Sequence, residues 1–306
     1  MAHARADRPS PTMSEFAKTF LRDGVEDGEY FGIFGKHPGW DDHIEDLPLP
    51  TMSMAVAKQL LYVRGIGSQI SSGAWARLAE DARLPDFDHA FLWMRGRQCL
   101  AGRMWASRDG KKRAHFPMIA LYQGVNVQPD AVVGSMLARL EKIAAGVRLA
   151  RSAEKVREII ASQANHSTEA MAEEGPTVLH LNRTAVSKFT RDLRGNLAPG
   201  CRVGADPADL SGTLRFWARV SGSLVSPEMP LLWIAPVGAS WIDVLAREPM
   251  PTQFFCLRAK PPALAMTYSA NTQEPTEELD AAEAIKTATE GKGGGGRSWF
   301  ARMMGH

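Results

Sequence analysis

The chain divides into short apolar runs and longer amphipathic stretches, and this pattern predicts a mixture of strands and helices. Apolar runs bounded by Gly or Pro predict strands at Tyr30–Phe34, Ala90–Met94, Cys99–Ala106, Phe116–Tyr122, Val178–Leu181, Pro230–Ala235 and Gln253–Leu257. Apolar positions at helical spacing predict helices at Ser53–Val63, Ala74–Ala82, Asp130–Val147, Ser152–Gln163, Thr184–Leu193, Leu210–Val220 and Trp241–Ala246. Gly65 and Gly67 are expected to interrupt the first helix, and Gly200–Pro207 is expected to be a loop.

Residues 88–122 have the pattern of an antiparallel meander. Their three apolar runs are separated by Arg95-Gly96-Arg97 and by a turn that contains Asp109-Gly110, and Asp-Gly favours the tight turn that matches strand twist. Mixed with helices in this order, the strands predict an α/β fold, a layered sandwich with a largely antiparallel or mixed sheet flanked by helices.

Composition changes along the chain predict four segments. Residues 1–28, with two prolines and many charges, are expected to form a mobile N-terminal tail, and 29–259 a single α/β domain. Residues 260–296, rich in Pro, Thr, Ala and Glu and ending in four glycines, are expected to be a flexible linker. Residues 297–306 form a short basic and apolar C-terminal tail.

The overall composition narrows the class of protein. A 306-residue chain with 44 % hydrophobic and 23 % charged residues is long enough for a sizeable core. A net charge of +2 does not indicate nucleic acid as a partner. The three cysteines, Cys99, Cys201 and Cys256, form no C-x-x-C pair, so reduced thiols and a cytoplasmic location are expected. No stretch has the length of a membrane helix, so stable membrane insertion is not expected, and no secretory signal is found.

The loop after the first expected strand is the most distinctive stretch, YFGIFGKHPGWDDHIED, from Tyr30 to Asp46. Gly35 gives backbone freedom at the start of the loop, and Pro38 stiffens it. The crowded side chains that could ligate a divalent metal are His37, Asp41, Asp42, His43, Glu45 and Asp46. The alternative is that the aspartates cap a turn and accept backbone N–H groups.

A second turn carries Ser107, Asp109, Arg113 and Pro117. Arg113 can pair with Asp109, or with an aspartate of the first loop, as a structural clasp. The other possibility is a direct contact from this turn to a ligand or partner. The residues expected to be structural or partner-binding are Lys36, Pro38, Asp41, Asp42, Ser107, Asp109 and Arg113.

Enzyme motifs are weak throughout the sequence. Gly35-Lys36 lacks the rest of a phosphate-binding loop, with His37 where Ser or Thr should stand. Gly65-Ile-Gly67 lacks the third glycine of a dinucleotide fingerprint, and no G-x-S-x-G elbow occurs. We therefore expect a non-enzyme with no cofactor and no resident metal. The alternative is a metal-dependent hydrolase that uses the His37–Asp46 cluster.

Four segments in order resemble the TagF/ImpM accessory proteins of bacterial type VI secretion. The family's strand and G-K-x-P-x-x-G-D-F loop is similar to Gly35, Lys36, Pro38 and Asp41 or Asp42, with Gly32 and Phe34 before them. Its later tryptophan strand and P-S-x-D-x-x-G-R-x-x-P turn resemble Trp93, Gly102, Ser107, Asp109, Arg113, Phe116 and Pro117. Its P-x-x-W-W and G-L-P-x-x-F stretches resemble 230–234 and 249–254. The likeness spans roughly 29–258, with Ala106, Ile234 and His43 departing from the pattern.

The resemblance implies an α/β sandwich without catalytic residues. It also implies a cytoplasmic regulator that restrains the secretion machine through protein–protein interaction, with a forkhead-associated scaffold protein as the expected partner. In the C-terminal tail, Trp299, Phe300 and Met303 could bury apolar area on a partner while Arg302 supplies charge, or the tail could be an unstructured end. The identity of the partner, the direction of regulation, the oligomeric state, and whether this chain still serves type VI secretion stay open at this stage.

Overall fold

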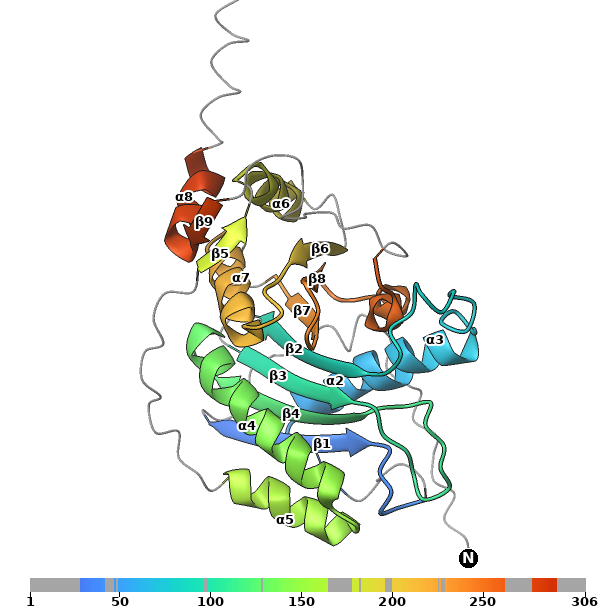
Figure 1. Ribbon diagram of the computed structural model, residues 1–306. Coiled ribbons are helices and arrows are strands. Elements are labelled where there is room, and N and C mark those ends of the chain that lie inside the picture. Colours follow the sequence, from blue (N-terminus) through green and yellow to red (C-terminus); the bar gives the residue numbers. More distant parts are fainter. Residues whose placement is uncertain are drawn as a thin grey trace, which may run out of the picture.

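The computed structural model describes residues 28–41, 47, 49–95, 98–127, 129–164, 178–181, 183–195, 200–224, 226, 229–261 and 277–290. Its centre is a seven-stranded sheet with the order β1-β4-β3-β2-β7-β8-β6, and all six strand pairs are antiparallel (Figure 1). The strands are β1 (Glu29–Gly35), β2 (Asp88–Arg95), β3 (Gln98–Trp105), β4 (Met118–Val125), β6 (Gly200–Gly204), β7 (Leu231–Pro236) and β8 (Trp241–Ala246).

Helices cover both faces of this sheet, so the molecule has three layers (Figure 1). One face packs against α4 (Pro129–Leu149), α5 (Ala153–Ala164) and α7 (Leu210–Leu224). The other face packs against a helical layer made of α2 (Met52–Ala57), η1 (Lys58–Ile66), α3 (Gly67–Ser71) and the short 3₁₀ helix η2 (Pro251–Arg258). The predicted fold class, an α/β layered sandwich with a largely antiparallel or mixed sheet flanked by helices, is confirmed, and the sheet is antiparallel at each of its six strand pairs.

Burial on both faces explains the sequence of the central strands. Along β2, Ala90, Leu92 and Met94 belong to the core under α4, whereas Phe91 and Trp93 belong to the core under η1. Because successive side chains of a strand point to opposite faces, a strand covered on both sides is apolar at nearly every position. The predicted meander over 88–122 is confirmed, with β2, β3 and β4 paired in sequence order.

The first long helix does not end where its glycines predicted. The chain stays helical from Met52 to Ser71, with a wide π-helical part at Lys58–Ile66. Gly65 is required there because an added Cβ would lie 2.5 Å from the ring of Phe254 on η2. The glycine therefore serves close packing between two elements rather than a break. The helix predicted at Ala74–Ala82 is also wrong, since those residues form turns.

Three predictions in the C-terminal half are wrong. Trp241–Ala246 is the strand β8, Gly200–Pro207 begins with the strand β6, and Gln253–Leu257 lies in η2. Successive side chains of β8 face the two cores alternately, and this two-residue period is that of a strand. A six-residue apolar run of this kind fits either structure in the sequence alone, and pairing with β7 decides it.

The region predicted to be a linker is partly structured. Residues 260–296 contain β9 (Glu277–Asp280) and α8 (Ala281–Glu290), and β9 pairs antiparallel with β5 (Val178–Leu181). Leu279 and Ala284 are fully buried against neighbouring helices. The prediction of a flexible linker is therefore wrong for 277–290. One further helix, α6 (Arg183–Gly195), packs against α8.

Several predictions concern residues outside the described ranges. These are the N-terminal tail up to residue 27 and the C-terminal tail residues Trp299, Phe300, Arg302 and Met303. Within the described ranges, none of the helices combines the length and the apolar character needed to cross a membrane.

Candidate functional site

The end of β1 is held against the loop that precedes β4. Gly35 has φ 123°, and the backbone N–H of Lys36 donates to the carbonyl of Pro117 over 3.3 Å. An added Cβ on Gly35 would lie 2.3 Å from that same carbonyl oxygen. Only glycine combines this positive φ with so close a backbone approach. The first loop is thereby directed toward the segment that contains Ser107, Asp109 and Arg113.

Asp109 joins the two loops through three polar contacts. Its Oδ2 accepts from Lys36 Nζ at 3.0 Å and from Arg113 Nε at 2.7 Å, and its Oδ1 accepts from the Arg113 backbone N–H at 2.9 Å. We refer to Lys36, Asp109 and Arg113 as the clasp. The Asp109 side chain is fully buried and that of Lys36 is 6 % exposed, whereas that of Arg113 is 45 % exposed.

Both sequence alternatives for Arg113 are realised in part. The guanidinium pairs with the Asp109 carboxylate, and its Nη2 also donates to the backbone carbonyl of Asp41 in the first loop. The contact to Asp41 therefore goes to the main chain and not to the carboxylate.

The clasp keeps Asp109 ionised. Burial by itself raises the pKa of this carboxyl, but the Arg113 backbone N–H, the Lys36 ammonium and the Arg113 guanidinium together hold the pKa well below its usual range. A carboxylate with no exposed surface and two cationic partners is poorly placed to accept a proton from a substrate or to attack one. The chemistry of the clasp is therefore that of a structural ion pair.

Backbone contacts complete the joint between the loops. The N–H of Gly110 donates to the carbonyl of Trp40 at 2.7 Å, and an added Cβ on Gly110 would lie 2.5 Å from the Asp41 carboxylate. The indole Nε1 of Trp40 donates back to the carbonyl of Gly35 at 3.3 Å. The two loops therefore form one rigid corner of the molecule at the end of β1.

His37 attaches this corner to α4. Its Nε2 lies 2.9 Å from the carbonyl of Val147 on α4, and its Nδ1 accepts from the backbone N–H of Gly39 at 3.0 Å. The ring stacks on Trp40 with centroids 4.3 Å apart. These partners define a neutral imidazole that carries its proton on Nε2.

The arrangement around His37 bears on the metal hypothesis. Both ring nitrogens are engaged within the protein, so His37 would have to break a hydrogen bond to become a ligand. Across the residues that the structure describes, no group of three or more His, Cys, Asp or Glu side chains could hold a metal ion. The other proposed ligands, Asp42, His43, Glu45 and Asp46, lie outside those residues.

A pH prediction follows from His37. Burial, with a further contribution from the charge of Arg151, lowers its pKa below 6.5 in the folded protein, although the Val147 carbonyl opposes this shift. The unfolded chain therefore binds this proton more readily, and folding stability falls as the pH drops below about 6.5. We expect the difference in melting temperature between wild type and His37→Gln to shrink from pH 7.5 to pH 5.5. An unchanged difference would contradict a neutral His37.

Three further predicted site residues lie at the same corner in different environments. Pro38 and Asp41 are exposed on the first loop, and Ser107 is half-buried on the second. Asp42 lies outside the described residues. The structure thus brings together Lys36, Asp109 and Arg113 as a bonded set, with Pro38, Asp41 and Ser107 on the loops around it.

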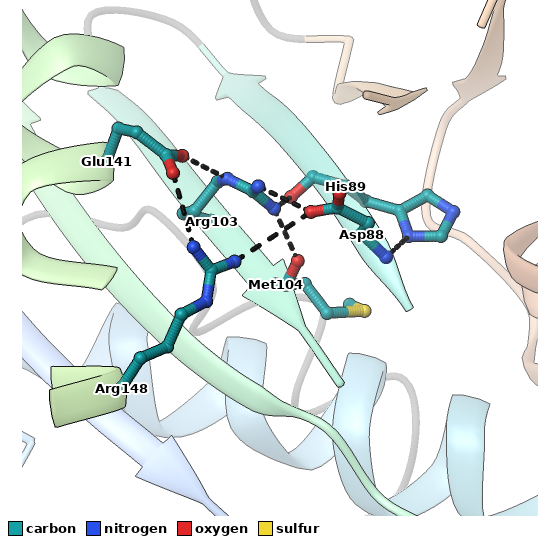
Figure 2. A network of polar contacts seen from close by, with 6 residues as sticks. All are labelled: Asp88, His89, Arg103, Met104, Glu141 and Arg148. Carbon is teal, nitrogen blue, oxygen red and sulfur yellow. Dashed lines mark hydrogen bonds and ion pairs between the residues drawn. The ribbon is translucent and has the colours of Figure 1, made fainter. Parts of the chain in front are cut away.

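A second polar network was missed in the sequence. Arg103 of β3 is almost fully buried, and its guanidinium bridges Asp88 at the start of β2 and Glu141 on α4 (Figure 2). Arg103 Nη1 also donates to the carbonyl of Met104 at 2.7 Å. Arg148 on α4 lies 3.4 Å from Glu141 and 4.0 Å from Asp88. The network fastens α4 to the sheet (Figure 2).

A third buried pair lies on the opposite face of the sheet. Arg202 of β6 makes two hydrogen bonds to Asp243 of β8, at 2.8 and 2.9 Å, and a third to the carbonyl of Ala259. The signal for both missed networks is a lone arginine at an inward position of an apolar strand. Its partner could not be read from the sequence because it depends on strand register.

The chain has little measurable likeness to known proteins. No protein-family model matches it, and no curated protein sequence matches it. Among solved structures it is similar to the crystal structure of PA0076 from Pseudomonas aeruginosa PAO1. The two are 16 % identical with a TM-score of 0.40, and the match covers 75 % of this chain and 94 % of PA0076. A likeness of this degree carries no functional information.

Proposed function

We propose that this chain is a non-enzymatic accessory or regulatory protein of a type VI secretion system or a related assembly. It acts in the cytoplasm by protein–protein interaction and restrains assembly, with a forkhead-associated scaffold protein as its partner. One observation carries the proposal. The two segments with the strongest resemblance to the TagF/ImpM family, far apart in the chain, are joined in space by the buried clasp.

The residues of the resemblance have structural duties at this joint. Gly35 permits the close approach of the Pro117 carbonyl. The Asp109 carboxylate accepts hydrogen bonds from Lys36 of the first loop and from Arg113 of the second. Each duty depends on the residue type. Residues that fix the shape of a corner are what a binding scaffold requires, since its surface loops must be presented by a rigid frame.

Other positions of the resemblance have comparable structural duties within the sheet. An added Cβ on Gly32 would lie 2.9 Å from the side chains of Leu49 and Met54, and one on Gly102 would lie 2.0 Å from the ring of Phe91. Trp93 is fully buried beneath the η1 layer. These residues support a common fold and supply no reacting group.

The test is direct binding followed by a measurement in cells. The full chain should bind the purified forkhead-associated scaffold protein of the type VI system from the same bacterium, measured by calorimetry. Deleting the gene should raise secretion through that system, and expressing the wild-type chain in the deletion strain should lower secretion again. Absence of binding together with unchanged secretion would overturn the proposal.

A further inference from the structure

A strongly basic turn contains two of the three clasp residues, Asp109 and Arg113. Residues 106–115 read ASRDGKKRAH and contain four cations with a single carboxylate, Asp109. That carboxylate is buried and already bound to Lys36 and Arg113, while Arg108, Lys111, Lys112 and Arg113 are exposed. The turn therefore exposes its four positive charges to solvent, while its one carboxylate is buried.

The basic surface extends to the turn between α4 and α5. Gly110 contacts Trp40 and Asp41 of the first loop. Gly39, which precedes Trp40, lies against the turn between α4 and α5, where a Cβ added to Gly39 would lie 3.1 Å from the carbonyl carbon of Arg151. Arg151 is exposed and close enough to His37 to lower its pKa. We call Arg108, Lys111, Lys112, Arg113 and Arg151 the basic corner.

Most of these cations have no role in holding the fold. Among the described residues, the side chains of Arg108, Lys111 and Lys112 make no hydrogen bond or ion pair, whereas the Arg113 side chain is held by the clasp. Three neighbouring cations without partners repel one another, and a partner of opposite charge would remove that repulsion.

The backbone that carries the cations is fixed before any partner arrives. The Arg113 N–H is bound to the Asp109 carboxylate, and the Lys112 N–H donates to the Asp109 carbonyl at 2.8 Å. Lys112 itself is held at φ 64°. A turn ordered in this way loses little conformational entropy when it binds, which favours affinity.

We propose that the basic corner is the docking surface for an acidic segment of a partner protein, rich in carboxylates or phosphorylated side chains. This inference rests on the proposed function for the class of partner, and it adds the location and the charge of the contact. A protein segment is favoured over nucleic acid because the whole chain carries a net charge of only +2. Charge complementarity of this kind sets association rate and specificity.

The test compares two variants of equal charge change in the full chain. Arg108→Glu/Lys111→Glu reverses two cations of the basic corner. Arg157→Glu/Arg191→Glu reverses two exposed cations on α5 and α6 that also make no bond with a described residue. The probe is a decaglutamate peptide at low and at physiological salt. We expect the first variant to bind about tenfold more weakly than wild type and the control to stay within about twofold.

The outcomes separate this inference from the proposed function. Equal losses in both variants, or no loss in either, would overturn the basic corner as a docking surface, and so would tighter binding of a ten-nucleotide DNA strand than of the peptide. If the scaffold protein binds the first variant as well as wild type, the inference fails and the proposed function stands. If no variant binds the scaffold but the peptide pattern holds, the proposed function fails and the inference stands.

Discussion

Replacing Asp109 by Asn is expected to lower the melting temperature by about 10 °C, the largest loss from any single change at this corner. The substitution keeps the shape of the side chain but removes the buried carboxylate that the Lys36 ammonium binds at 3.0 Å. Arg113 can turn toward water because its side chain is 45 % exposed, whereas Lys36 cannot. The measurement is thermal unfolding followed by circular dichroism at pH 7.

Two further variants test the cause of that loss. Asp41→Ala removes an exposed carboxylate from the same corner, and its melting temperature should stay close to that of wild type because Arg113 binds only the main-chain carbonyl there. Adding Lys36→Met to Asp109→Asn removes the buried ammonium that has lost the Asp109 carboxylate and should recover part of the lost stability. A double variant less stable than Asp109→Asn would contradict this explanation.

The same carboxylate gives an acid dependence of defined sign. The pKa of Asp109 is depressed in the folded protein, so its stabilisation is complete above the unfolded pKa of about 4 and is lost as the pH falls below it. The gap in melting temperature between wild type and Asp109→Asn should therefore be constant near neutrality and narrow below about pH 4. A gap that persists undiminished at pH 2.5 would show that the charge is not its source.

Replacing Gly35 by Ala is the second large effect, with an expected loss of about 3 kcal/mol in the free energy of unfolding. The new Cβ would lie 2.3 Å from a backbone oxygen of Pro117, at φ 123°. The Pro117 carbonyl directly precedes the paired strand β4 and is bound by the Lys36 N–H. Because it cannot move aside cheaply, the end of β1 has to shift and the clasp with it. Urea unfolding measures the loss.

Gly238→Ala is the matched control for Gly35. Gly238 also has a positive φ, 73°, in the turn between β7 and β8, but an added Cβ there meets no atom within 4 Å. Its loss should be limited to backbone strain, about 1 to 2 kcal/mol. If Gly35→Ala costs no more than Gly238→Ala, the close approach to Pro117 contributes nothing and the account of this corner is wrong.

The local pattern of apolar and turn residues predicted those strands and helices whose boundaries depend on neighbouring residues alone. The meander of β2, β3 and β4 was visible because its runs are separated by turn residues, and α4 was visible because its apolar stripe is long. By contrast, β8 was predicted as a helix and β6 as a loop. Their state is decided by pairing with distant strands, and a short apolar run carries no information about that pairing.

The candidate site was predictable to a similar degree. Asp109 and Arg113 are four residues apart in the same turn, so their pairing could be predicted from the local sequence. The burial of Lys36 could not, because it depends on the register that places Gly35 opposite Met118. Arg103 and Arg202 were missed for the same reason, as each finds its carboxylate on another strand or on a helix.

The pairing of β1 with β4 also affects how the chain emerges during synthesis. Phe31 lies opposite Tyr122, so β1 waits for roughly 90 further residues before its partner exists. At ribosomal speeds of about 5–20 residues per second, that wait lasts roughly 5–20 s. During this time the aromatic run of β1 is without its native cover, and exposed apolar surface of this kind makes a nascent chain prone to aggregation.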